Sequence, residues 1–130
     1  MKKKQQKIWS IISWFLLPVL WMGVIFLLSD QPVLPGPKVF LGDFLFKKGA
    51  HMFFFAALYV LWHLSLDRFE QNTGKKIKRK WLWALILVFL FSLTDEYHQS
   101  FIPGRTATWR DIGFDNLGSL LAMLWVYKII

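Results

Sequence analysis

Uncharged apolar stretches alternate with short polar stretches along the chain. The first, residues 8–28, has 21 residues without a charge, which is enough for a helix that crosses a membrane. Three more cover residues 49–66, 81–99 and 112–130. The charge-free part of the third has only 14 residues, so we expect its helix to continue into the polar residues that follow. The pattern predicts an all-α integral membrane bundle of four transmembrane helices, in a single domain of residues 1–130.

Proline and glycine residues occur in the segments that connect the predicted helices. Several such residues predict that no long helix forms within residues 29–47: Pro32, Pro35, Gly36, Pro37 and Gly42. Residues 40–46 are apolar enough to lie on the membrane surface, and residues 67–80 form a polar, strongly basic connection. Pro103 and Gly104 predict a turn before the fourth helix. Pro18 inside the first span is tolerated in lipid, where a neighbouring helix can bond the carbonyl that proline leaves free.

Composition supports a membrane protein and excludes several other classes. The chain has 130 residues, of which 55% are hydrophobic, and a mean hydropathy of +0.40. A soluble domain of this size could bury only part of that apolar surface. A nucleic-acid-binding module would need its charge on a polar surface, so the net charge of +8 does not predict a nucleic-acid partner. The absence of cysteine excludes a disulfide framework, a thiol nucleophile and a cysteine zinc site.

The distribution of basic residues predicts how the chain is oriented. The first seven residues hold four lysines, and residues 67–80 hold six basic residues. With Lys128, eleven basic residues fall on one predicted side of the membrane and five on the other. Cytoplasmic loops of membrane proteins carry the excess of Lys and Arg. We therefore expect both termini to be cytoplasmic in a multi-pass protein of the cell membrane.

The remaining polar residues gather at the outward ends of the predicted helices. Ionisable groups at membrane depth are costly, so they usually face the bundle interior and carry function. Helical spacing places Gly118 and Ala122 on the same stripe as two of these acids, where small residues let a neighbouring helix approach. We expect one outward-facing polar site, whose candidate ligand-binding residues are Ser29, Gln31, Lys48, His51, Tyr59, Asp95, Glu96, Gln99, Arg105, Asp111 and Asp115.

Some of these residues have a simpler structural interpretation. Asp111 precedes the fourth predicted helix and could be its N-cap. Lys48 and Arg110 could be anchors at the membrane interface, and we interpret His63 as structural. The adjacent pair Asp95 and Glu96 is harder to explain in this way, because two carboxylates repel and disfavour a helix C-terminus.

Four sequence elements resemble the VanZ-like family. Residues 25–32 (I-F-L-L-S-D-Q-P) are similar to the family's exit from its first helix, and Lys48, His51 and Phe55 match K-x-x-H-x-x-x-Y/F. Residues 95–105 (D-E-Y-H-Q-S-F-I-P-G-R) look like its D-E-x-x-Q-x-F-x-P-x-R block. The fourth element is D-x-x-x-[DN]-x-x-G at residues 111–118, where the second family glycine is replaced by Ala122. The family's namesake gives low-level resistance to teicoplanin, a lipoglycopeptide that acts on the cell wall.

Three classes of function fit this pattern. In the first, the outward site binds or modifies a cell-envelope ligand, such as a cell-wall precursor, a lipid headgroup or a lipoglycopeptide, and so lowers susceptibility to glycopeptide antibiotics. In the second, the chain is a membrane enzyme with Glu96 as base, His51 as acid and Arg105 as anion stabiliser. In the third, it is a structural accessory subunit. We predict no cofactor and no metal site, since no ligand spacing such as H-E-x-x-H appears, and the oligomeric state stays open.

Overall fold

The secondary structure is entirely helical in a computed structural model, which describes residues 1–30, 40–102 and 108–129. The helices are α1 (Lys2–Ser29), α2 (Phe40–Thr73), α3 (Lys80–Gln99) and α4 (Trp109–Val126). The predicted all-α class is therefore confirmed, with four helices in the described part of the chain. Two of them, α1 and α2, are long and apolar enough to cross a membrane.

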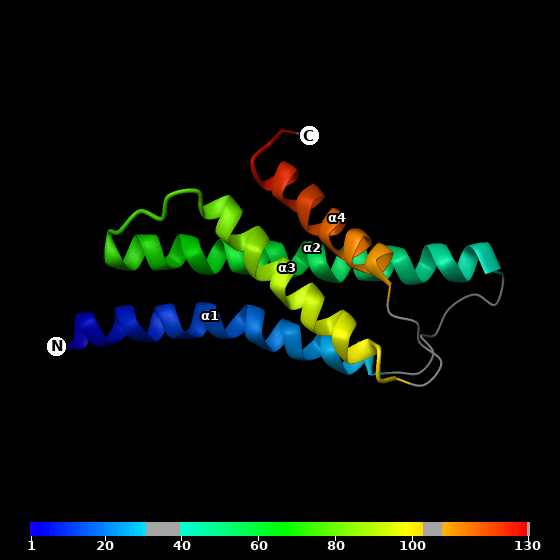
Figure 1. The fold of residues 1–130 in the computed structure, drawn as a ribbon. Helices are drawn as coiled ribbons and strands as arrows, with labels where there is room; N and C mark the ends of the chain where they lie inside the picture. Colours follow the sequence, from blue (N-terminus) through cyan, green and yellow to red (C-terminus); the bar gives the residue numbers. More distant parts are fainter. Residues whose placement is uncertain (31–39, 103–107, 130) are drawn as a thin grey trace.

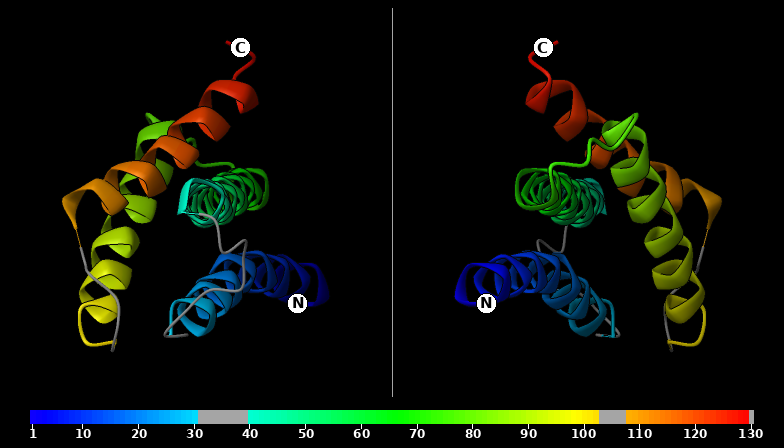
Figure 2. Two further views of the ribbon diagram at one scale, coloured as in Figure 1. Left: turned by 90° about the vertical axis from the view of Figure 1, so that its right-hand side faces the viewer. Right: turned by 90° about the vertical axis from the view of Figure 1, so that its left-hand side faces the viewer.

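Helix α2 organises the bundle, because it contacts each of the other three helices. Helix α1 runs beside α2, while α3 and α4 cross α2 obliquely (Figure 1). Seen along α1 and α2, helix α3 lies on one side of that pair (Figure 2). The ends of α1 and α3 and the first halves of α2 and α4 meet at one end of the bundle, which we call the polar end (Figure 1).

The inside and outside of the bundle are inverted relative to a soluble protein. Large apolar side chains cover its exterior, and in α1 only Pro18, Ile25 and Ser29 are buried. Buried polar residues share the interior with an aromatic and aliphatic core centred on Phe55, Leu58 and Tyr59. A lipid environment favours this distribution, whereas water would not tolerate so large an exposed apolar surface.

Proline 18 is accommodated as expected. It has no N–H to donate to the carbonyl of Trp14, four residues earlier in the helix. The Ser65 hydroxyl of α2 lies 2.7 Å from that carbonyl oxygen and 2.8 Å from the Leu61 carbonyl oxygen of its own helix, so it can donate its one proton to either. A neighbouring helix can therefore supply the missing hydrogen bond, and α1 continues through the proline.

The predicted helix boundaries were wrong at several ends. Helix α2 begins nine residues before position 49 and ends seven residues after position 66, so residues 40–46 continue into α2 and are not a separate surface segment. Gly42 alone does not stop a helix, and the polar residues after position 66 remain helical until Gly74, whose positive φ of 71° ends the helix. Helix α1 starts at Lys2, ahead of the predicted position 8.

Helix α4 is also shifted relative to the prediction, since it begins at Trp109 and ends at Val126. Thr108 is its N-cap, so Asp111 lies in the first turn and not at the cap. The prediction started the helix at residue 112, directly after the last charged residue before the apolar stretch. A negative charge in the first turn is, however, favourable at a helix N-terminus, so Asp111 can lie inside the helix.

Helices α2 and α4 touch at Gly118, as its small size predicted. A Cβ atom placed on Gly118 would lie 2.8 Å from the Cα of Met52 and closer still to the Met52 carbonyl oxygen. Both atoms belong to the α2 backbone and cannot turn aside. Gly118 therefore sets the distance between the helices that carry His51 and Asp115.

Candidate functional site

The polar end brings together side chains from all four helices. We call this group the polar cluster and define it as the buried and half-buried residues Ser29, Lys48, His51, Asp95, Glu96, Gln99, Asp111 and Asp115. Eight of the sequence-predicted site residues therefore belong to one region. Gln31 and Arg105, which were also predicted, lie outside the described residues.

Asp95 is held by a small network between α1 and α3. Its Oδ2 accepts hydrogen bonds from the Ser29 hydroxyl, at 3.1 Å, and from the Gln99 amide, at 2.8 Å. The Gln99 amide also lies 3.3 Å from the Ser29 oxygen. Gln99 is one helical turn after Asp95, so both point in the same direction. These contacts fix the carboxylate of a side chain that is 0% exposed.

His51 and Asp115 form the corresponding contact between α2 and α4. The His51 Nδ1 lies 3.1 Å from the Asp115 Oδ1. The imidazole also stacks against Phe55, one turn further along α2, with an interplanar angle of 10°. Asp115 is 1% exposed, so this contact is inside the bundle.

The two remaining acids of the cluster are tied to the start of α4. Lys48 forms an ion pair with Asp111, which also accepts a hydrogen bond from the Thr108 hydroxyl at 2.9 Å. The Glu96 Oε1 accepts the backbone N–H of Thr108 at 2.9 Å. Sequence reasoning did not single out Thr108, although the T-x-x-D spacing at residues 108–111 is a typical helix-start signal.

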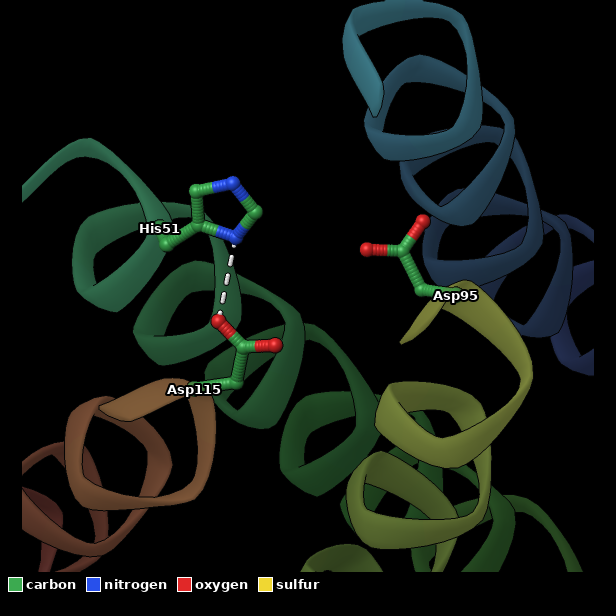
Figure 3. Close-up of side chains that lie close together, drawn as sticks. All are labelled: His51, Asp95 and Asp115. Carbon is green, nitrogen blue, oxygen red and sulfur yellow. Dashed lines mark hydrogen bonds and ion pairs between the residues drawn. The ribbon is translucent and has the colours of Figure 1, made fainter. Parts of the chain in front are cut away.

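Four carboxylate oxygens in the cluster have no hydrogen-bond partner among the described residues: Asp95 Oδ1, Glu96 Oε2, Asp111 Oδ1 and Asp115 Oδ2. Asp111 Oδ1 is ion-paired with Lys48, so the other three remain open. His51, Asp95 and Asp115 each offer one ligand-type atom, and the three atoms lie within 4.8 Å of one another. Figure 3 shows one Asp95 oxygen directed toward the His51–Asp115 pair. These three side chains could hold a metal ion, and their positions on three helices explain why no short spacing motif indicated it.

An apolar cavity opens beside the cluster. It has a volume of about 220 Å³ between α1 and α2 and is lined mainly by apolar side chains, including Ile25, Leu28 and Phe54. Ser29 and His51 line it as well. The polar cluster and the apolar cavity are therefore adjacent, and Ser29 and His51 belong to both.

Tyr59 does not join the cluster. It lies eight residues after His51 on α2, which is about 12 Å along the helix axis. Its ring lies near His63 instead, with 6.1 Å between the ring centroids. Helical spacing places Tyr59 and His51 on one face of α2, but that face extends beyond the site.

A second polar network lies at the opposite end and was largely missed by sequence reasoning. His63 contacts the Tyr127 hydroxyl at 3.0 Å and Asp67 at 3.3 Å. Lys80 pairs with both Asp67 and Glu70. The spacing of residues 63, 67 and 70 places them on one face of α2, a signal that the high positive charge of the segment concealed. The structural interpretation of His63 fits this network.

A family model described as VanZ/LLP1 matches residues 14–130 of the chain. The chain belongs to the VanZ/LLP1 family. The match includes most of α1 and all of the helices that follow, so the resemblance found in the four sequence elements is confirmed. Comparisons with curated proteins and with solved structures give no match. Family membership and the two apolar helices together identify this VanZ/LLP1 chain as a membrane protein.

Proposed function

We propose that this protein crosses the cell membrane four times, with both termini in the cytoplasm, and binds an amphipathic cell-envelope ligand. The ligand is a lipid or a lipid-linked cell-wall precursor. Its headgroup lies on the polar cluster and its apolar chain lies between α1 and α2. In this way the protein would lower susceptibility to glycopeptides such as teicoplanin, the phenotype that the family resemblance implies.

The observation that carries this proposal is the shared boundary of cavity and cluster. An apolar cavity of about 220 Å³ ends at Ser29 and His51, which belong to the polar cluster. Ligand pockets commonly combine a mostly apolar lining with a few polar groups that fix orientation. An acyl chain fits the first part and a hydroxyl, amide or phosphate group fits the second.

The charge distribution supports the orientation. Basic residues concentrate at the N-terminus and between α2 and α3, at the end of the bundle away from the polar cluster. The positive-inside rule assigns that end to the cytoplasm. The polar cluster would then face outward, where cell-wall precursors are used.

One observation favours an enzyme as the second candidate. Glu96, whose buried Oε2 has no hydrogen-bond partner among the described residues, lines a groove of about 310 Å³ between α3 and α4 together with Tyr97, Ser100 and Thr108. A buried carboxylate beside an accessible groove is suited to act as a general base. A purely structural accessory role predicts that changes in the cluster affect only protein level.

The cavity can be filled selectively to test the proposal. Ala50 lines the cavity beside the cluster, so Ala50→Leu should occupy the space that an acyl chain needs. Ala57→Leu is the matched control, because Ala57 lines a second apolar cavity between the same helices that no residue of the polar cluster reaches. Both variants add the same atoms to the same helix.

We expect native mass spectrometry of the purified protein to find a retained envelope lipid on wild type and Ala57→Leu, and little of it on Ala50→Leu. Teicoplanin susceptibility should rise with the loss of the lipid while protein level stays normal. Equal lipid retention by both variants would contradict the proposed site. A product made only in cells with wild type, and lost in Glu96→Gln, would instead favour an enzyme.

A further inference from the structure

Three helices direct ligand-type side chains at one point inside the polar cluster. His51 comes from α2, Asp95 from α3 and Asp115 from α4 (Figure 3). One nitrogen and two carboxylate oxygens from these residues lie within 4.8 Å of one another. Because the residues are far apart in sequence, only the fold brings them together.

The two carboxylates are buried and only half satisfied. Asp95 is 0% and Asp115 is 1% exposed, yet Asp95 Oδ1 and Asp115 Oδ2 have no hydrogen-bond partner among the described residues. A buried carboxylate costs several kcal/mol unless it is paired. A cation bound by both carboxylates would remove this cost.

The contacts around the trio hold it in a ligand-binding orientation. Ser29 and Gln99 occupy Oδ2 of Asp95 and leave Oδ1 open. The stacking of His51 on Phe55 restrains the imidazole ring. Metal-binding side chains in proteins usually have such outer contacts, which fix the direction of their lone pairs.

The charge of the two carboxylates, Asp95 and Asp115, determines which kind of cation suits this site. A protonated His51 would neutralise only one of the two carboxylates and leave a net negative charge in the bundle. A divalent ion with a neutral imidazole neutralises both. Lys48 pairs with Asp111 and offsets only part of the charge of Asp115.

We propose that His51, Asp95 and Asp115 bind a divalent first-row transition-metal ion, with Zn²⁺ or Mn²⁺ as the best fit. Imidazole favours transition metals, whereas Mg²⁺ and Ca²⁺ prefer oxygen ligands alone. Ligand atoms around tetrahedral Zn²⁺ lie about 3.4 Å apart, so no pair in the trio needs to move more than about 1.4 Å closer, which side-chain rotation can provide. Three protein ligands leave a coordination position for water or a ligand group. The inference goes beyond the proposed lipid binding and does not depend on it.

The test uses the full chain, purified without a histidine tag and stripped with EDTA. After addition of Zn²⁺, Mn²⁺, Mg²⁺ or Ca²⁺ and gel filtration, we expect one equivalent of Zn²⁺ or Mn²⁺ per chain. Binding to the folded state should also raise the melting temperature as the metal concentration increases. Co²⁺ in place of Zn²⁺ should give a visible absorption band that depends on His51.

Asp115→Asn and Asp95→Asn keep the side-chain shape and should weaken metal binding at least tenfold. Asp30→Asn is the matched control, since it makes the same change at the same end of the bundle but Asp30 is exposed and lies outside the polar cluster. It should bind metal as wild type does.

The proposal is overturned if stripped wild type takes up no stoichiometric metal, a result that needs no variant to fold. It is also overturned if Asp30→Asn loses the metal as strongly as Asp115→Asn, or if Mg²⁺ and Ca²⁺ bind as tightly as Zn²⁺. Ala50→Leu separates the two proposals, because it should lose the lipid and keep the metal.

Discussion

The close approach of α2 and α4 makes Gly118→Ala a sharp test of the packing. The added methyl carbon would lie 2.8 Å from the Met52 Cα, whereas ordinary contacts begin near 3.4 Å. The atoms it meets belong to the backbone, so no side chain can rotate to make room. The two helices must separate by more than about 0.6 Å to accept one methyl group, because the Met52 carbonyl oxygen would lie even closer to it than the Cα does.

The energetic cost follows from this geometry. Overpacking of a close contact typically costs about 1–3 kcal/mol. Alanine in place of glycine regains up to about 1 kcal/mol of helix propensity, so we expect a net destabilisation of roughly 1–2 kcal/mol. Gly113→Ala in the same helix is the matched control, because nothing lies within 4 Å of the added atom. It should be neutral or slightly stabilising.

The packing change should also reach the polar cluster. Gly118 lies one turn after Asp115, and Met52 directly follows His51. A separation of about 0.6 Å would lengthen the 3.1 Å contact between His51 and Asp115 beyond a normal hydrogen bond. Gly118→Ala should therefore weaken metal binding, while Gly113→Ala should not.

The measurement is unfolding of the purified protein by SDS in mixed micelles, with gel-filtration profiles as a check on folding. The variant at Gly118 should unfold at a lower SDS fraction than wild type, and the variant at Gly113 should not. If the two variants are equally stable, the helices can separate without cost, and the role assigned to Gly118 is wrong.

Two further predictions concern the first helix and the orientation. Ser65→Ala should destabilise the protein by about 0.5–1.5 kcal/mol in the SDS assay. The loss should be smaller in a Pro18→Ala background, because the Trp14 carbonyl regains a hydrogen-bond partner in its own helix. Equal effects in both backgrounds would mean that Ser65 does not act through that carbonyl. Single cysteines at Thr106 and Gln71, in a chain without native cysteine, should react with an impermeant maleimide from outside and only after lysis, respectively, and the reverse pattern would overturn the orientation.

Helix number and several pairings could be predicted from the sequence, but helix ends could not. Apolar stretches reveal which residues avoid water, and they indicated all of the helices in the described residues. A helix, however, ends where its backbone conformation changes. Gly74 ends α2 with a positive φ, seven residues after Asp67 had already ended the apolar stretch. The residues that end an apolar stretch are therefore different from the residues that end the helix.

The site shows a similar division. The sequence placed Asp95 and Gln99 in one candidate site and Gly118 on one stripe with two acids; in the structure Gln99 contacts Asp95, and Gly118 lies against α2. Spacing could not say how far a face extends into the site, so Tyr59 was included although it lies beside His63. Spacing also could not identify His51, Asp95 and Asp115 as one group of potential metal ligands, because their proximity depends on how three helices pack.

The cluster uses its acids in a way that a structural role alone does not explain. Asp95 and Asp115 each join two helices through one oxygen and leave the other open. An amide oxygen would accept the same hydrogen bonds without the cost of a buried charge. Packing between the helices therefore does not require the negative charge of these carboxylates. That charge is available to bind a cation or a polar headgroup. Asp→Asn variants separate the two roles, since the helix contacts should survive in them while binding should not.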